Sequence, residues 1–221
     1  MGARGLEYIL EFFCPAMTDV FSLVSRLARS MLIYETHAPM LVQKIFSKAF
    51  DWRISQMHVA CRRAIAAEVA EFGSGGTAFL STPSIYFSLD KDHRANCKVF
   101  DLDTKWAKDP GFVHYDFSKP EDIPEHLRGT FEMVVADPPF ITRQVWESYT
   151  AATKLLLRPG GAGLVLCSTI SENAPFMQDL LGANPCKFKP SIPNLVYQYS
   201  LYVNYNSKRF SVENPEIPSE E

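Results

Sequence analysis

Short apolar runs that end in polar residues recur along this chain from residue 77 onward. Four of them are followed by a hydroxyl or a carboxyl group, at Ser81, Asp101, Asp116 and Asp137. Apolar residues at helical spacing separate the first two runs and follow the fourth, which is typical of strands alternating with helices. Because parallel strands joined in this way bring their carboxyl ends to one edge of a sheet, we expect these four residues to lie close together.

The pattern predicts seven strands and three helices after residue 53. The expected strands are Thr77–Ser81, Cys97–Phe100, Phe112–Phe117, Phe131–Ala136, Gly163–Cys167, Lys187–Pro190 and Tyr197–Tyr205. The expected helices are Ile54–Phe72, Val145–Leu157 and Glu172–Leu181. In the last strand apolar and polar residues alternate, which is typical of an antiparallel strand at the edge of a sheet. The fold class is therefore α/β, with a mostly parallel sheet and an antiparallel end.

Three segments with different patterns indicate the domain organisation. Residues 1–50 carry two amphipathic stretches and are expected to form a helical extension that packs on the main domain, a partner-binding face being the alternative. Residues 51–208 hold the alternating pattern and form the expected catalytic domain. Residues 209–221 are acidic and contain Pro215 and Pro218, so we expect a disordered tail.

Composition narrows the class of protein. Apolar residues make up 47% of the 221 positions, which is enough for one packed domain. The net charge is −3 and no basic run exceeds two residues, so a nucleic-acid substrate is not favoured, although it is not excluded. Five cysteines without close spacing indicate neither a disulfide framework nor a metal site. No apolar run reaches about 18 residues, so we expect no membrane span. We also expect the protein to be cytoplasmic and monomeric.

The most informative stretch is Val134-Val135-Ala136-Asp137-Pro138-Pro139-Phe140. A buried strand must end at Asp137, because proline cannot donate to a sheet ladder and its φ is fixed. An acid, a constrained backbone carbonyl and an aromatic ring then converge where α/β sheets bind ligands. The alternative is an ordinary turn that uses these residues for conformational reasons.

The other strand ends supply candidates for cofactor binding. The first loop has no glycine, but its hydroxyls and a helix start could hold a charged group. Its residues are Ser81, Thr82, Pro83 and Ser84. About 20 residues later, Asp101 or Asp103 suits a carboxylate that accepts hydrogen bonds from ribose hydroxyls, and only one of them is expected to serve. Asp116 ends the third run; whether it binds a cofactor or is an ordinary loop acid stays open at this point.

The chain resembles the family first described as probable N6-adenine methyltransferases, whose better-known members are elongation factor 1-alpha lysine methyltransferases. The resemblance covers residues 52–206. Its motifs are Trp52–Gln56, Ser81–Tyr86, Phe100–Asp103, Tyr115–Phe117, Phe131–Phe140, Cys186–Pro190 and Tyr202–Tyr205. Met57-His58-Val59 departs from the family pattern, in which an aromatic cluster follows the first motif and borders the active site.

The resemblance implies a class I methyltransferase fold and S-adenosylmethionine as the cofactor. It implies that Asp137, Pro138, Pro139 and Phe140 form the catalytic loop. The Asp137 carboxylate and the Pro138 carbonyl would accept hydrogen bonds from the target nitrogen, Phe140 would pack against the target group, and Asp116 would contact the adenine amino group. Protein lysine, in elongation factor 1-alpha, is the implied substrate. Adenine in DNA or RNA is the alternative, because the loop chemistry suits both.

Overall fold

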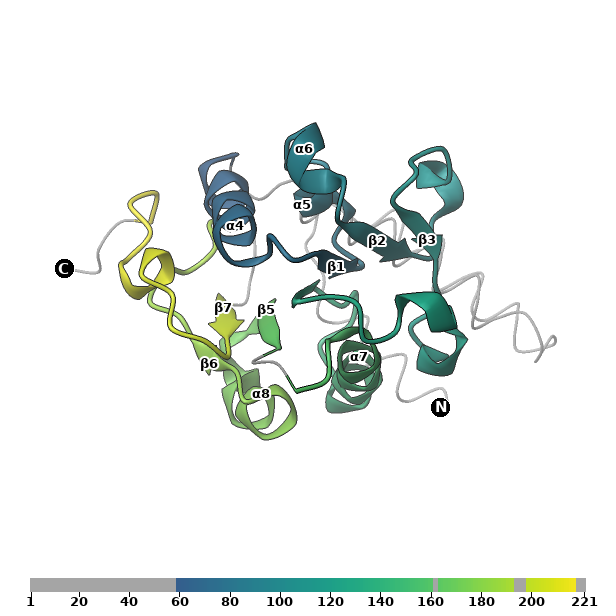
Figure 1. Cartoon of the computed structure of the whole chain (residues 1–221). Helices are drawn as coiled ribbons and strands as arrows, with labels where there is room; N and C mark the ends of the chain where they lie inside the picture. The colour runs from purple at the N-terminus through teal and green to yellow at the C-terminus, as the bar shows by residue number, and fades with distance from the viewer. Residues whose placement is uncertain (1–58, 161–162, 193–197, 218–221) are drawn as a thin grey trace, which may run out of the picture.

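One seven-stranded sheet organises the described part of the molecule. The structure is a computed structural model, and it describes residues 59–160, 163–192 and 198–217. The strand order is β3-β2-β1-β4-β5-β7-β6 (Figure 1). Strands β1 to β5 are parallel, and β7 pairs antiparallel with both of its neighbours, β5 and β6. The strands are β1 (Thr77–Leu80), β2 (Lys98–Asp101), β3 (Phe112–His114), β4 (Met133–Ala136), β5 (Leu164–Ile170), β6 (Asn184–Pro185) and β7 (Tyr199–Val203). The predicted fold class is confirmed.

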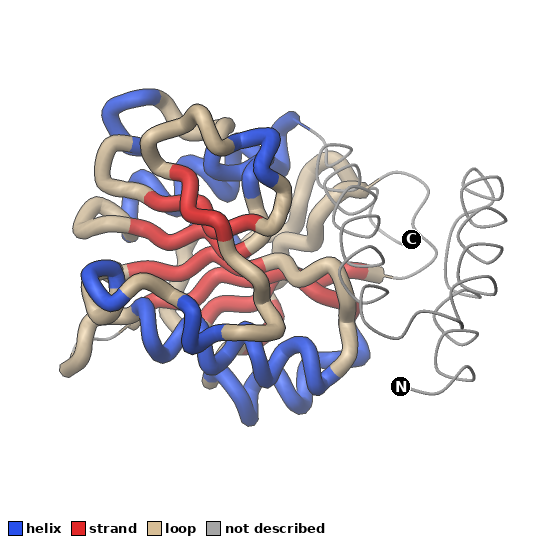
Figure 2. Tube along the Cα trace, turned by 90° about the vertical axis from the view of Figure 1, so that its right-hand side faces the viewer, coloured by secondary structure: helices blue, strands red, loops and turns tan. Residues whose placement is uncertain are grey.

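Helices cover both faces of this sheet, which forms the central layer in Figure 2. On one face lie α4 (Val59–Phe72), α5 (Pro83–Tyr86) and α6 (Lys91–Arg94), and on the other lie α7 (Arg143–Leu156) and α8 (Ala174–Leu181). Five short 3₁₀ helices occur in the described connections: Thr104–Trp106, Pro120–Asp122, Glu125–Leu127, Ser171–Asn173 and Arg209–Ser211. None of the helices within the described ranges is long and apolar enough to cross a membrane.

The pleat of the central strands divides the apolar side chains between two cores. Phe79 and Val135 point to the α4 face and pack with Ile65, whereas Leu80 and Val134 point to the α7 face. The second core contains the α7 residues Trp146, Tyr149, Ala152 and Leu156, all fully buried. Because both faces are covered, the strands read as continuous apolar runs, as is usual for parallel sheets.

The carboxyl-terminal strands differ from the prediction. Lys187–Pro190 is not a strand; β6 is Asn184–Pro185 instead. The predicted edge strand β7 lies between β5 and β6, and all five of its residues are buried. Both faces of β7 are covered, so its polar positions are enclosed: the Ser200 hydroxyl lies 2.9 Å from that of Ser171.

The expected disordered tail also differs from the structure, over residues 209–217. Phe210 is 1% exposed and packs against Phe188, with ring centroids 5.6 Å apart. The Arg209 guanidinium donates to Glu68 at 3.1 Å and to Glu71 at 2.8 Å, which ties this segment to α4. Burial of the Phe210 ring and the ion pairs of Arg209 offset the entropy that is lost when this segment becomes ordered. The acidic composition gives no indication of these contacts. The predicted helical extension 1–50 and the last residues, 218–221, lie outside the described residues.

Smaller differences concern where elements begin and end. The strand predicted to reach Phe117 ends at His114, and the strand predicted to end at Cys167 continues to Ile170. Phe131 forms only an isolated bridge with Leu157 and not part of β4. Among the described cysteines, Cys61, Cys97, Cys167 and Cys186 are free thiols. Burial raises the pKa of Cys61 to about 12, which keeps that thiol protonated and unreactive.

Candidate functional site

The four predicted strand ends meet at one edge of the sheet. Leu80 is in register with Phe100 on one side and with Ala136 on the other, so β1, β2 and β4 end together. The Asp137 amide donates to the Leu80 carbonyl at 3.3 Å, which holds the start of the loop Asp137–Phe140 against β1. The chain order reverses between β1 and β4, and this switch point is where ligands bind in open α/β sheets.

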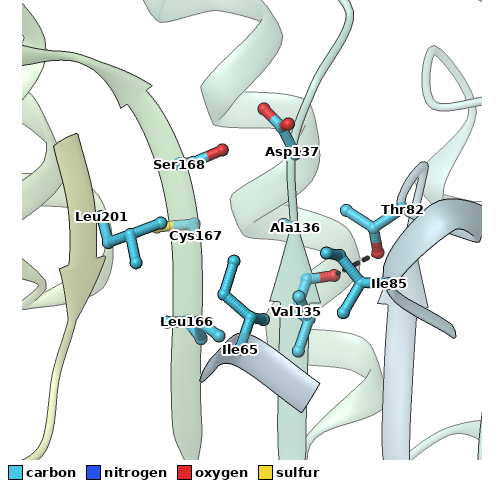
Figure 3. A pocket seen from close by; sticks show the side chains of 10 residues that line it. All are labelled: Ile65, Thr82, Ile85, Val135, Ala136, Asp137, Leu166, Cys167, Ser168 and Leu201. Atoms are coloured by element: carbon cyan, nitrogen blue, oxygen red, sulfur yellow. Dashed lines mark hydrogen bonds between the residues drawn. The ribbon is translucent and has the colours of Figure 1, made fainter. Parts of the chain in front are cut away.

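Asp137 lies at the mouth of a small, mostly apolar pocket beside this switch point (Figure 3). The pocket is lined by Ile65, Thr82, Ile85, Val135, Ala136, Asp137, Leu166, Cys167, Ser168 and Leu201. Asp137 is 6% exposed, and both following prolines are buried. Phe140 is half-buried at the rim of the loop. The Asp137 carboxylate thus lies next to the apolar walls of this pocket.

The first loop turns sharply at Ser81. Its φ of 55° is the one positive value at a non-glycine position within the described ranges. The Ser81 amide donates to the Phe100 carbonyl at 2.9 Å, so the turn is fixed to β2. Thr82 is buried, and its hydroxyl donates to the Val135 carbonyl at 3.5 Å. Thr82 and Pro83 are therefore the buried side of this loop, whereas Ser81 and Ser84 are partly exposed.

The structure gives different surroundings to Asp101, the last residue of β2, and Asp103, which follows it. Asp101 is 7% exposed, and its Oδ1 accepts the Asp103 amide at 2.7 Å. Asp103 instead caps the 3₁₀ helix that follows: its Oδ1 accepts the Lys105 amide at 3.0 Å, and its Oδ2 lies 3.3 Å from the Lys105 ammonium. Asp101 is therefore the candidate for ribose binding, and Asp103 has a structural role.

Asp116 follows β3 and is half-buried. Its Oδ1 accepts both the amide of Ser118, at 2.9 Å, and the hydroxyl of that residue, at 2.7 Å. These bonds fix the carboxylate in a turn beside the sheet edge. His114, the last residue of β3, is exposed.

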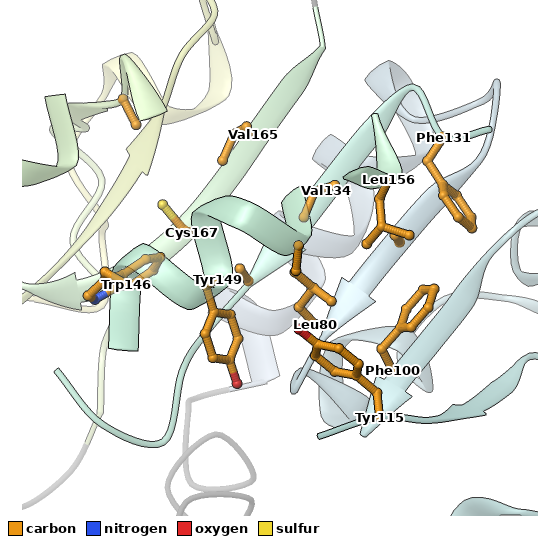
Figure 4. Close-up of a cluster of buried hydrophobic side chains, with 14 of the residues drawn as sticks. Leu80, Phe100, Tyr115, Phe131, Val134, Trp146, Tyr149, Leu156, Val165 and Cys167 are labelled. Carbon is orange, nitrogen blue, oxygen red and sulfur yellow. The ribbon is translucent and has the colours of Figure 1, made fainter. Parts of the chain in front are cut away.

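Two supporting residues were not predicted as part of the site. Tyr149, fully buried on α7 (Figure 4), has its hydroxyl 2.6 Å from that of Ser81. Asn173 is 7% exposed, and its amide donates to the Ile141 carbonyl at 2.8 Å and to Thr169 at 2.9 Å. Asn173 thereby holds the backbone that directly follows Phe140. The sequence marks Tyr149 only as an inward-facing position of a helix.

Comparison with known proteins agrees with this geometry. The model of the family described as "Probable N6-adenine methyltransferase" matches residues 43–207. EEF1A lysine methyltransferase 1 of Bos taurus is 36% identical over 166 residues, which cover 71% of this chain and 72% of that protein. The Homo sapiens protein of the same name is 32% identical over 166 residues, 71% of this chain and 76% of that protein. A protein-lysine N-methyltransferase of Dictyostelium discoideum is 30% identical over 182 residues, 78% and 85% of the two chains.

The chain belongs to this family. It is a methyltransferase of the class that uses S-adenosylmethionine, with the seven-stranded fold of that class. The residues at the sheet edge fit such a cofactor, because a buried carboxylate at the end of β2 suits ribose hydroxyls and a turn without glycine is opened by the positive φ of Ser81. The described residues contain no group of three or more potential metal ligands.

Proposed function

We propose that this methyltransferase modifies the side-chain amine of a lysine in a protein, and that elongation factor 1-alpha is its substrate. The names of the relatives support this choice of substrate. The single structural observation that carries the proposal is the Asp137 carboxylate, held at the sheet's switch point beside an apolar pocket. We also propose that the enzyme works as a monomer in the cytoplasm.

The catalytic loop has the groups that an amine nucleophile needs. A lysine amine has a reference pKa of about 10.4 and must lose a proton before it can attack. The aromatic wall of Phe140 and the apolar pocket disfavour the ammonium form, whereas Asp137 attracts the cation and orients it. Once one proton has passed by way of Asp137 to water, the neutral amine keeps two N–H groups. One would donate to the Asp137 carboxylate and the other to the Pro138 carbonyl, which leaves the lone pair to attack the methyl group. The main contribution of the loop is positioning.

The cofactor would be held along the edge from β1 to β3. We propose that Asp101 accepts from the ribose hydroxyls, that Asp116 contacts the adenine amino group, and that Ser81 and Ser84 line the methionine end. When bound, S-adenosylmethionine supplies an electrophilic methyl group, and the thioether leaves as the new C–N bond forms. The same loop acceptors could also draw the amino group of an adenine towards tetrahedral geometry, so the assay must include nucleic acids.

The experiment is methyl transfer from radiolabelled S-adenosylmethionine to separate acceptors. Elongation factor 1-alpha, a mixed cytosolic lysate, DNA and RNA are assayed in parallel, with the Asp137→Ala variant beside the wild type. We expect label on elongation factor 1-alpha and a loss of about 100-fold or more in the variant, because an interaction made in the transition state is removed. Hydrolysis to amino acids should then recover methylated lysine.

Cofactor binding and thermal unfolding of the Asp137→Ala variant serve as controls for folding. Asp109→Ala is the matched control, because Asp109 is an acid beside Tyr86 and Arg94, and neither belongs to the catalytic loop. It should keep methyl transfer. Label on nucleic acid in place of protein would overturn the assignment of lysine as the substrate. Turnover retained in the Asp137→Ala variant would overturn the proposed catalytic role of the loop.

A further inference from the structure

Ser81 has a backbone conformation that a serine rarely adopts. A φ of 55° places its Cβ close to the following carbonyl, which disfavours this conformation for residues other than glycine. Glycine would take this turn without strain. Such a conformation persists only where neighbouring groups hold it in place. The contacts of Ser81 must therefore explain why a serine occupies the first residue of the cofactor loop.

The hydroxyl of Tyr149 is the group that holds the Ser81 side chain, at 2.6 Å. Tyr149 comes from α7, which begins just after the catalytic loop, and its ring is fully buried between the sheet and neighbouring aromatic residues (Figure 4). Burial raises the pKa of Tyr149 well above its usual value, and the nearby Asp101 and Asp137 raise it further. The hydroxyl therefore stays neutral and available to its partner at physiological pH.

A row of aromatic contacts connects this hydrogen bond to the catalytic loop. The Tyr149 ring centroid lies 5.6 Å from that of Phe117, and the Phe117 centroid lies 6.2 Å from that of Phe140. Phe117 directly follows Asp116, the candidate contact to the adenine group. One side chain from α7 thus contacts the first cofactor loop through its hydroxyl and the walls of the site through its ring.

We propose that Tyr149 is a positioning residue that sets the conformation of the cofactor loop through Ser81. Its hydroxyl holds Ser81 in a positive-φ conformation that a glycine would adopt without such a contact. Because the inference depends on the proposed role of the Ser81–Ser84 loop, its test begins with the affinity of the wild type for S-adenosylmethionine. A wild type that does not bind would refute the proposed site, whereas the variants below test Tyr149.

The first variant is Tyr149→Phe, which removes one oxygen and keeps the ring. We expect the dissociation constant and the KM for S-adenosylmethionine to rise about fivefold, the effect of about 1 kcal/mol for one hydrogen bond. The kcat at saturating cofactor should change less than twofold. Tyr202→Phe is the matched control, because that buried hydroxyl donates to the Ile170 carbonyl at 3.0 Å. It should lower the melting temperature without changing cofactor affinity.

A double-mutant cycle with Ser81→Gly separates positioning from general stability. Glycine adopts the positive φ by itself, so Tyr149→Phe should have no effect on affinity when glycine is present. Ser81→Ala keeps the strain and loses the hydroxyl, so it should resemble Tyr149→Phe. Equal affinity of Tyr149→Phe and the wild type would overturn the inference, as would an effect of Tyr149→Phe that persists in full beside Ser81→Gly.

Discussion

The two acids at the end of β2 allow a direct test of where the cofactor's ribose binds. We consider Asp101→Asn and Asp103→Asn, which are chemically identical changes two residues apart. Asparagine at 101 keeps an oxygen that can accept the Asp103 amide, so the turn between them survives. Asparagine at 103 can still cap the following 3₁₀ helix, because its oxygen can accept the Lys105 amide. Neither variant should unfold.

The magnitude follows from the burial and charge of Asp101. A hydrogen bond to a charged group contributes about 1.5–3 kcal/mol, roughly twice a neutral one. Asparagine removes the charge and turns an N–H towards a hydroxyl, so we expect a loss of about 2–3 kcal/mol. That loss weakens the binding of S-adenosylmethionine by about 30- to 150-fold. Asp103 has its oxygens engaged by Lys105, and we expect its variant to change affinity less than about threefold.

Isothermal titration with S-adenosylhomocysteine measures both variants under the same conditions, and thermal unfolding of the unliganded proteins reports their stability. A similar, small change in both would show that neither acid binds the ribose. A larger loss for Asp103→Asn would mean that the cofactor approaches from the other side of the loop, and the assignment of Asp101 would be wrong.

Two further predictions concern residues that support the site and the fold. Asn173→Ala removes the donor that holds the backbone after Phe140, so kcat should fall about tenfold while cofactor affinity stays within about twofold; steady-state kinetics and titration measure the two effects, and an unchanged kcat would contradict the positioning role. Arg209→Met leaves the fully buried Glu68 carboxylate without its cation, and because the guanidinium is 35% exposed we expect a loss of about 2 kcal/mol in unfolding free energy. Arg143→Met breaks ion pairs that are exposed to solvent, so its loss in the same urea denaturation should be much smaller; equal losses would refute the importance of the buried pair.

The edge that carries the site was predictable because the end of each strand is visible in the sequence as a polar residue after an apolar run. Asp101 and Asp137 directly follow buried apolar runs, and the rule that parallel strands end together then brings them to one edge. These signals are local, so they need no knowledge of the packing. The roles of Asp101 and Asp103 could not be separated in this way, because residues two apart in a strand point to the same face. Only the turn that follows β2, in which Asp103 caps the next 3₁₀ helix, distinguishes them.

The carboxyl-terminal segment shows where local signals fail. Apolar and polar residues alternate in Tyr197–Tyr205, and this pattern is the same for a polar face in solvent and for one enclosed against a hydroxyl such as that of Ser171. Only the position of β6, which pairs with β7 and makes it an inner strand, decides between the two cases. Acidic composition after residue 208 likewise suggested disorder. Yet the buried ring of Phe210 packs against Phe188, and Arg209 pairs with Glu68 and Glu71 of α4, so the start of this segment is held on the domain.

The supporting residues of the site were beyond prediction for a related reason. Tyr149 meets Ser81 across 68 positions of sequence, and Asn173 meets Ile141 across 32. Both residues have ordinary local explanations, as a core position of α7 and as a residue before a helix. A polar atom buried inside an apolar core costs free energy unless it has a partner. The Tyr149 hydroxyl inside the α7 core therefore required a partner. Only the position of β1 relative to α7 shows that this partner is Ser81, at the turn that follows β1.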